Sequence, residues 1–231
     1  VTENTLVIAS SYSGNTEETL SCLGQARDRS AQIGILASGG KMIDIAKQDS
    51  ITHVAVPANL QPRMATLFML RGLIALLAEF KIVPGECLDE IAATGEWLKQ
   101  ETANWLPTVS TDQNPAKQYA LLAVGKTPVF YGGTLSAPLA YKWKISWNEN
   151  AKNTAFCNQY PEFNHNEFMG WASHPVEKPF EVFDLVSPME HPQILKRFQI
   201  SDKLLSGKRP KANTINLRGD TLLQQLEQVE Q

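Results

Sequence analysis

Short β-branched runs alternate with helical patterns along the sequence, and this alternation constrains the fold more than any other feature. The run at 6–10 (LVIAS) ends in a Ser, Gly and Asn cluster, and a helical pattern that carries Leu20 and Leu23 begins at Asn15. Strands that alternate with helices at this spacing form parallel sheets joined by right-handed crossovers. The sequence therefore predicts an α/β protein with mainly parallel sheets, each flanked by helices in a three-layer αβα arrangement.

The alternation occurs on both sides of a polar segment at 107–117 (PTVSTDQNPAK), which lacks periodic apolar residues and is typical of a linker. We therefore expect two lobes, at 1–107 and 118–231. Strands are expected at 6–10, 33–37, 53–56, 127–131, 154–157, 180–186 and 213–217. Helices are expected from residue 15 and at 42–48, 63–80, 86–106, 137–151 and 193–205.

Composition excludes several classes of protein. The 231 residues are 43% hydrophobic and 19% charged, and the net charge of -3 supplies no basic field for a nucleic acid or an anionic membrane. The longest apolar stretch, at 67–78, is interrupted by Arg71 and Gly72. It is shorter than the roughly 20 residues that a membrane span needs. We therefore expect neither a nucleic-acid partner nor an integral membrane protein.

The cysteines indicate a reducing compartment. Cys22, Cys87 and Cys157 are an odd number at wide spacing without a CxxC pair, which favours small buried residues over a disulfide framework. The N-terminal residues VTENTLVIAS show no basic segment followed by a long apolar core, so no secretory signal is visible. These features predict a cytoplasmic location.

The segment SSYSGNTEET at 10–19 is the best candidate for a binding site. It lies where a parallel strand passes into a helix, at the sheet edge where α/β proteins bind ligands. Ser11, Ser13 and Thr16 offer hydroxyls, Gly14 permits a close turn, and the helix start favours an anion, so the loop suits a phosphate monoester. A turn capped by Ser and Asn, with acidic residues in the first helical turn, is the alternative, and both can hold together.

Three further residues are candidates for chemistry. Arg63 begins a helix beyond the third strand, where a guanidinium could stabilise an oxyanion; a solvated helix-start residue is the alternative. Glu149 lies between two Asn residues at the end of a Trp-bearing helix and is a candidate base. His165 follows 16 residues later, far enough for a short strand to bring it back near the same edge. Glu149 and His165 among amides indicate a proton-transfer pair and no metal site. The remaining histidines, at 53, 174 and 191, are interpreted as structural.

Five segments together resemble the bifunctional phosphoglucose/phosphomannose isomerase family of the sugar isomerase (SIS) superfamily. They are SSYSGNTEET, ASGGKMIDIA, ANLQPRMA, YKWKISWNENAKNTAF and YPEFNHNEFMGW. The first loop alone indicates an SIS domain, whereas PR, NENAK and EFNHNE in this order and spacing are specific to the family. The similarity extends from the first residues to about Trp171 and more loosely to Glu230.

The resemblance implies two SIS lobes, a homodimer, and interconversion of glucose 6-phosphate or mannose 6-phosphate with fructose 6-phosphate through a cis-enediolate, without cofactor or metal. It assigns the phosphate to Ser11, Ser13 and Thr16. It assigns the enediolate to Arg63, the base to Glu149, and ring opening to His165, which the partner subunit supplies in the family.

Two departures and two alternatives accompany the resemblance. Family members have a further strand and loop upstream and a helical tail with an active-site Lys downstream, so we expect a fragment truncated at both ends. A non-catalytic sugar-phosphate-binding SIS module would need only the phosphate loop. Another SIS enzyme, such as an aminosugar-phosphate isomerase or a muramic-acid etherase, is the other alternative, and NENAK and EFNHNE weigh against it.

Overall fold

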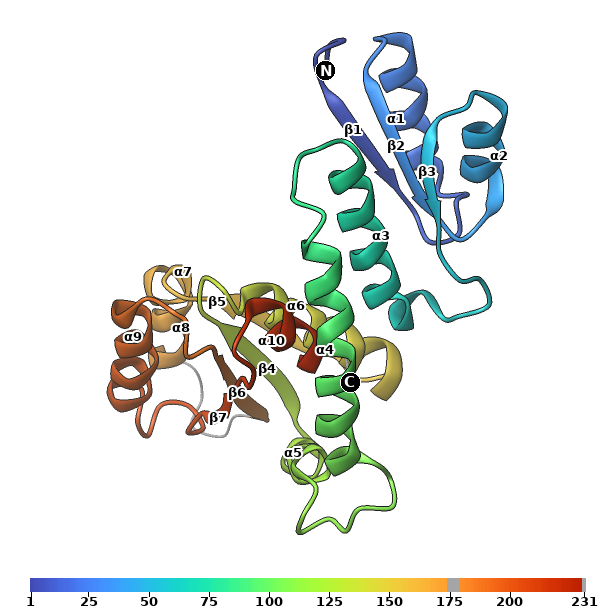
Figure 1. The fold of residues 1–231 in the computed structure, drawn as a ribbon. Helices are drawn as coiled ribbons and strands as arrows, with labels where there is room; N and C mark the ends of the chain where they lie inside the picture. Colours follow the sequence, from blue (N-terminus) through green and yellow to red (C-terminus); the bar gives the residue numbers. More distant parts are fainter. Residues whose placement is uncertain (174–178, 230–231) are drawn as a thin grey trace. The chain divides into compact units, whose positions relative to one another are not determined.

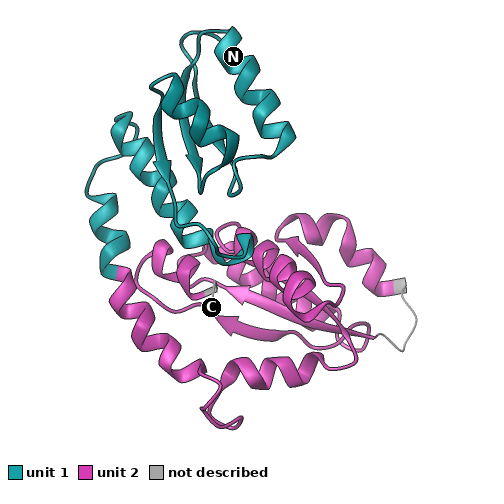
Figure 2. Cartoon of the chain, turned by 90° about the vertical axis from the view of Figure 1, so that its right-hand side faces the viewer, with its two compact units in different colours: residues 1–93 teal, residues 94–231 magenta. Residues whose placement is uncertain are grey.

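The computed structural model describes residues 1–173 and 179–229, and the chain divides into two compact units, Val1–Ala93 and Thr94–Gln231 (Figure 2). Each unit has its own sheet with strands that are all parallel, so the α/β prediction is confirmed. His174, interpreted as structural, lies outside the described residues, as does Glu230 at the expected limit of the resemblance. The lobe limits 1–107 and 118–231 stay a prediction.

The first unit is a three-stranded sheet with helices on both faces (Figure 1). Its strands, in spatial order, are β1 (Leu6–Ser10), β2 (Gln32–Ala37) and β3 (Thr52–Ala55). Its helices are α1 (Glu17–Asp28), α2 (Gly40–Gln48), the 3-10 turn η1 (Pro62–Met64) and α3 (Thr66–Glu79). Helix α4 (Cys87–Thr102) begins in this unit and crosses its boundary.

Alternation along β2 builds the two core layers of the first unit. Ile35 packs with α1 and α2, whereas its neighbour Leu36 packs with Leu76 of α3, because successive strand residues point to opposite faces. Gly72 lets α3 approach the sheet closely, since a Cβ there would lie 2.5 Å from the Leu36 side chain. The glycine that interrupts the longest apolar stretch is therefore a packing residue.

The second unit is a four-stranded sheet in the order β5-β4-β6-β7. Its strands are β4 (Thr127–Gly132), β5 (Phe156–Gln159), β6 (Phe180–Val186) and β7 (Asn213–Asn216). Its other elements are η2 (Ala103–Trp105), α5 (Pro115–Ala123), α6 (Ala137–Ser146), the π-helical turn η3 (Trp147–Ala151), α7 (Glu162–His165), α8 (Glu167–Ser173), α9 (Pro192–Leu204) and α10 (Leu222–Val229).

Two apolar clusters cover the two faces of the second sheet. Phe130 and Phe183 stack at 5.5 Å between ring centroids and pack under α6, while Tyr131 and Val182 face α7, α8 and α9. The side chains again alternate along the central strands. This arrangement places one sheet between helical layers, as the sequence predicts.

The expected linker at 107–117 is partly helical. Helix α5 begins at Pro115, and the Asn114 side chain accepts a hydrogen bond from the Lys117 N–H at 3.1 Å. Asn at the cap and Pro at the first helical position are helix-start signals. The linker interpretation was therefore wrong for residues 115–117. Asn and Pro are common both in loops and at helix starts, so the residue types alone did not distinguish the two.

Candidate functional site

The predicted phosphate loop joins the carboxyl end of β1 to α1. The hydroxyls of Ser11 and Thr16 share a hydrogen bond of 2.7 Å, and the Gly14 N–H donates to Ser11 Oγ at 3.2 Å. Ser13 Oγ accepts the Asn15 N–H at 3.2 Å. Ser11 is buried, whereas Ser13 and Thr16 are exposed. The structure therefore joins the Ser11 and Thr16 hydroxyls directly before a 12-residue helix, whose first N–H groups lack acceptors within the helix, whereas the Ser13 hydroxyl bonds within the loop.

A second loop, 38–40, holds the phosphate loop in place. Ser38 donates its hydroxyl to the Tyr12 carbonyl at 2.6 Å, and Asn15 Oδ1 accepts the Lys41 N–H at 3.1 Å. Gly14 has φ +68°, and a Cβ there would lie 1.9 Å from the Gly39 oxygen. Only glycine fits this left-handed position at such a short approach. The glycine of the SSYSGNT segment is therefore required for docking the two loops.

Tyr12 ties the phosphate loop to the segment that leads to Arg63. Its hydroxyl donates to the Pro57 carbonyl at 3.1 Å and accepts the Leu60 N–H at 2.9 Å. Arg63 follows in η1, where its Nη1 donates to Gln61 Oε1 at 3.4 Å. Sequence reasoning assigned nothing to Tyr12; the only available signal was its place within the loop motif.

Glu149 lies on the π-helical turn that ends α6. Its carbonyl accepts a hydrogen bond from Lys152 Nζ at 2.6 Å, and Lys152 adopts a left-handed φ of +55°. The preceding Trp147 packs against Phe130 in the core, at 6.2 Å between centroids. The Glu149 side chain is exposed beside this anchor. Single π-helical turns of this kind are frequent at functional sites.

His165 does not return to the sheet edge that carries Glu149. Helix α6 runs back from the carboxyl end of β4, and Asn153 Nδ2 donates to the carbonyl of Lys126, which precedes β4, at 3.2 Å. Glu149 is therefore at the amino edge. At the other edge the Tyr160 N–H donates to the carbonyl of Gly132, the last residue of β4, at 2.8 Å. His165, which ends α7 after β5, lies at this carboxyl edge, because β4 and β5 are parallel. The same-edge prediction was wrong because it ignored the return of the helix.

Burial and hydrogen bonds fix the residues on either side of His165, while the His165 side chain itself is exposed. Phe163 is fully buried, and the Asn164 amide donates to Ser201 Oγ of α9 at 2.7 Å. On the other side, Glu167 accepts hydrogen bonds from the Tyr131 hydroxyl and, at 2.8 Å, from the Asn158 amide. The frame therefore presents the imidazole outward.

The loop after β4 resembles the phosphate loop but already holds an anion. Glu190 Oε1 accepts the N–H groups of Leu135 at 2.6 Å and Ser136 at 3.2 Å, at the start of α6. Ser136 Oγ accepts the Gly133 N–H at 2.8 Å and donates to the Leu185 carbonyl at 2.7 Å. Glu190 is 5% exposed. A protein carboxylate thus occupies the place that an external anion could take in the second unit.

A buried carboxyl group lies within the second sheet. Asp184 of β6 is 2% exposed, and burial raises its pKa to about 7, although the Arg209 guanidinium favours the charged form. Arg209 is buried too, with its guanidinium 5.6 Å from the Tyr131 ring centroid. These groups belong to the buried interior of the second unit.

Neither a metal-binding cluster nor a membrane-spanning helix is present among the described residues, 1–173 and 179–229. No group of three His, Cys, Asp or Glu side chains within them is arranged to hold a metal ion. No helix among the same residues is long and apolar enough to cross a membrane.

Parallel sheets between helices, with a hydroxyl-rich loop at a helix start, define an α/β protein of the class that the sequence predicts. The overall likeness to solved structures agrees: the chain matches a glucose-6-phosphate isomerase like protein from Thermus thermophilus with a TM-score of 0.66 and 18% identity. That match covers 99% of this chain and 70% of the other. At this identity the likeness shows the fold alone.

The sequence comparisons identify the family. Residues 112–229 match the family described as the bacterial phospho-glucose isomerase C-terminal SIS domain, and the chain belongs to this family. A bifunctional phosphoglucose/phosphomannose isomerase from Caldicellulosiruptor bescii is 34% identical, over 96% of this chain and 66% of the relative. A D-glucosamine-6-phosphate 4-epimerase from Sulfolobus acidocaldarius is 33% identical, over 75% of this chain and 53% of that relative. The chain thus spans just under two thirds and about half of these relatives.

Proposed function

We propose that the protein is an aldose-ketose isomerase that interconverts glucose 6-phosphate, mannose 6-phosphate or both with fructose 6-phosphate. The observation that carries the proposal is the predicted phosphate loop, in which the Ser11 and Thr16 hydroxyls meet just before α1 and Ser13 lies between them in the chain. The curated relative from Caldicellulosiruptor bescii, named for this pair of substrates, supports the choice of sugar.

The proposed reaction needs only proton transfers. His165 opens the sugar ring by moving a proton between O5 and O1. Glu149 takes the proton from C2 and returns it to C1 through a cis-enediolate, whose negative oxygen is stabilised by Arg63. The proton of the C2 hydroxyl moves to O1, so that C2 becomes the carbonyl carbon. Glucose and mannose differ only at C2, so both give the same enediolate and one base serves both. Phosphate binding supplies energy that holds C1 and C2 against the base. No cofactor or metal is required for these steps.

We further propose a homodimer with shared sites. Glu149 and His165 of one chain lie at opposite edges of the same sheet. A second copy can supply His165 to the site that contains Glu149. This division is a stronger reason for a dimer than exposed apolar residues would be, because catalysis itself then needs two copies.

Two SIS domains, at 1–107 and 118–231, and a cytoplasmic location complete the proposal. The two separate parallel sheets support the domain division. The odd number and wide spacing of Cys22, Cys87 and Cys157 support a reducing compartment. The expectation that these cysteines are buried was wrong, because Cys22 is exposed and the other two are half-buried.

The test is an isomerase assay on the full-length protein with glucose 6-phosphate and mannose 6-phosphate. We expect Glu149→Gln to lower turnover by roughly a hundredfold or more, since general bases contribute factors of this size. Glu96→Gln is the matched control, because Glu96 is an exposed glutamate on α4 of the same unit. Wild-type turnover in Glu149→Gln would overturn the assignment of the base.

An enzyme that acts on an aminosugar phosphate is the second candidate, and the epimerase relative favours it. Glucosamine 6-phosphate is the discriminating substrate. Conversion of glucosamine 6-phosphate, with no fructose 6-phosphate formed from glucose 6-phosphate or mannose 6-phosphate, would replace the first proposal. Binding of all three sugar phosphates without any turnover or solvent-proton exchange would indicate a non-catalytic binding module.

A further inference from the structure

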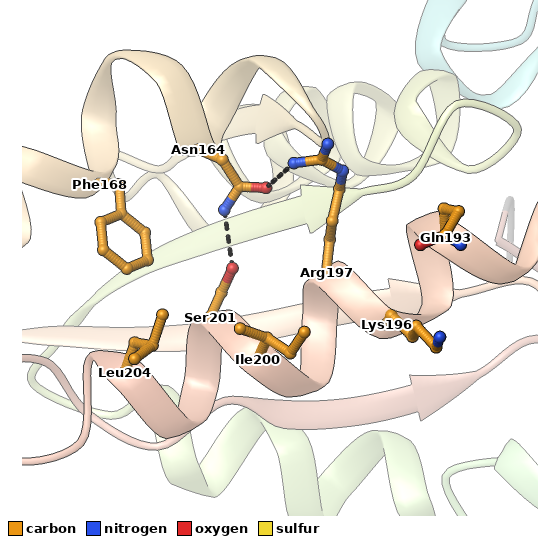
Figure 3. A pocket seen from close by; sticks show the side chains of 8 residues that line it. All are labelled: Asn164, Phe168, Gln193, Lys196, Arg197, Ile200, Ser201 and Leu204. Atoms are coloured by element: carbon orange, nitrogen blue, oxygen red, sulfur yellow. Dashed lines mark hydrogen bonds between the residues drawn. The ribbon is translucent and has the colours of Figure 1, made fainter.

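A groove on the second unit lies between the α7–α8 segment and α9. Its cavity volume is about 380 Å³, within the range of roughly 300–1,000 Å³ that is typical of small-molecule sites. Phe168 forms one wall, and Ile200 and Leu204 of α9 form the other (Figure 3). Ile200 is 52% and Leu204 59% exposed. The apolar part of the groove is therefore open to a ligand.

The polar part of the groove is cationic. Lys196 and Arg197 line it, and none of the described acidic residues does. Within the part of the chain that the structure describes, neither cation forms an ion pair. Arg197 Nη1 donates instead to the neutral Asn164 Oδ1 at 3.2 Å (Figure 3). A carboxylate or phosphate oxygen is a stronger acceptor for a guanidinium than an amide oxygen.

The groove also has a fixed polar anchor. Asn164 donates its amide to Ser201 Oγ at 2.7 Å, and Ser201 is only 2% exposed. This bond joins α7 to α9 and sets the width between them. The cations and the apolar wall are therefore held on a defined frame, in contrast to isolated side chains on an open surface.

We propose that this groove binds a small organic anion, with one carboxylate or phosphate group on Lys196 and Arg197 and a compact apolar group against Phe168, Ile200 and Leu204. Because Lys196 and Arg197 make the lining positively charged, it favours this anion over an uncharged peptide or a lipid tail. The proposal does not depend on the proposed isomerase activity, because it needs none of the residues assigned to catalysis.

One consequence does rest on the proposed function. Arg197 shares its hydrogen bond with Asn164, the residue directly before His165. An anion that binds the Arg197 guanidinium breaks its hydrogen bond to Asn164. The loss of this bond loosens α7, the short helix that carries the His165 imidazole. Occupancy of the groove then changes the rate of ring opening, with a larger effect on turnover of the cyclic sugar than on phosphate binding.

The test uses phenyl phosphate, with inorganic phosphate and phenol as separate arms, and follows backbone amide NMR shifts in the full-length protein. We expect saturable shifts at 196–201 with phenyl phosphate and weaker binding of each half alone. Arg197→Met should weaken binding by roughly tenfold or more, since a hydrogen bond to a charged group is lost. Lys203→Met, an exposed cation of α9 outside the groove, is the matched control.

Each other outcome contradicts the proposal. Shifts confined to the phosphate loop, or equal binding by Arg197→Met and Lys203→Met, would remove the groove as a site. A change in oligomeric state in Arg197→Met, with no binding of phenyl phosphate to the wild type, would assign the groove to a second copy of the chain. Loss of isomerase activity leaves all of these readouts unaffected, so failure of the proposed function is distinguishable.

Discussion

Gly14→Ala should selectively destabilise the first unit, which carries the predicted phosphate loop. Gly14 has φ +68°, and a left-handed backbone costs an L-residue roughly 1–2 kcal/mol. The new Cβ would lie 1.9 Å from the Gly39 oxygen, a backbone atom that no side-chain rotation can move. Forcing the two loops apart adds roughly 1–3 kcal/mol of strain. It also weakens the 3.1 Å bond from the Met42 N–H to the Gly14 carbonyl, worth about 1 kcal/mol.

The sum of these costs is about 3–6 kcal/mol, a large share of the roughly 5–15 kcal/mol that stabilise a typical domain. Gly24→Ala is the matched control. Gly24 lies inside α1, and a Cβ there meets no atom within 4 Å. Replacing a helical glycine with alanine stabilises by roughly 0.5–1 kcal/mol. The two substitutions add the same methyl group and should shift stability in opposite directions.

Hydrogen exchange with mass spectrometry is the appropriate assay. All five Trp residues, at 97, 105, 143, 147 and 171, lie in the second unit, so Trp fluorescence does not report on the first. We expect exchange of β1 and β2 to accelerate by about a hundredfold or more in Gly14→Ala, while β4 and β6 are unchanged. Gly24→Ala should slow exchange in the same peptides. Equal protection of β1 in Gly14→Ala and the wild type would refute the steric reasoning.

Substitutions at two further residues test the second unit, and Trp fluorescence is suitable for all of them. Glu190→Ala should lower the free energy of unfolding by about 2–4 kcal/mol, because the Leu135 N–H and the buried Ser136 N–H lose a charged acceptor. Glu190→Gln should cost less because its amide oxygen still accepts. Equal stability of Glu190→Ala and the wild type in urea would contradict this role. The pKa of Asp184 is raised to about 7 by burial, above its unfolded value of 3.8, so the folded state holds a proton that the unfolded state releases. Stability should therefore fall as pH rises from about 4 to 7. Asp184→Asn should flatten that slope, and an unchanged slope would show that another group causes it.

The strand pattern was largely predictable because it depends on local residues. All seven expected strands are present, and the strand at 180–186 has the expected limits. Strands with continuous apolar runs between Gly, Ser or Pro residues leave few alternatives. Short helices were harder: α7 has four residues, Glu162–His165, and its helical turn depends on burial of Phe163 among other aromatic rings. No periodic pattern of that length could indicate it.

The site residues likewise divide into those whose arrangement depends on nearby residues and those whose arrangement depends on distant segments. The hydroxyls of the phosphate loop are close in sequence, so their meeting at one helix start follows from local structure. Glu190 lies 55 residues after Leu135 and 54 residues after Ser136 in the sequence. The residues around Ser136 do not indicate a carboxylate partner. The separation of Glu149 and His165 was deducible, since a helix that follows a parallel strand returns the chain to the amino edge. The error came from counting residues between them without tracing that return.

Mixing two inactive variants tests the account most directly. Glu149→Gln and His165→Ala each damage one component of a site that we propose to be shared between two copies of the chain. Refolding them together at equal amounts gives half mixed dimers, each with one intact site of two, so activity should recover to about a quarter of the wild type. Activity no greater than that of the two variants measured separately, with mixed dimers demonstrated, would contradict the shared isomerase site.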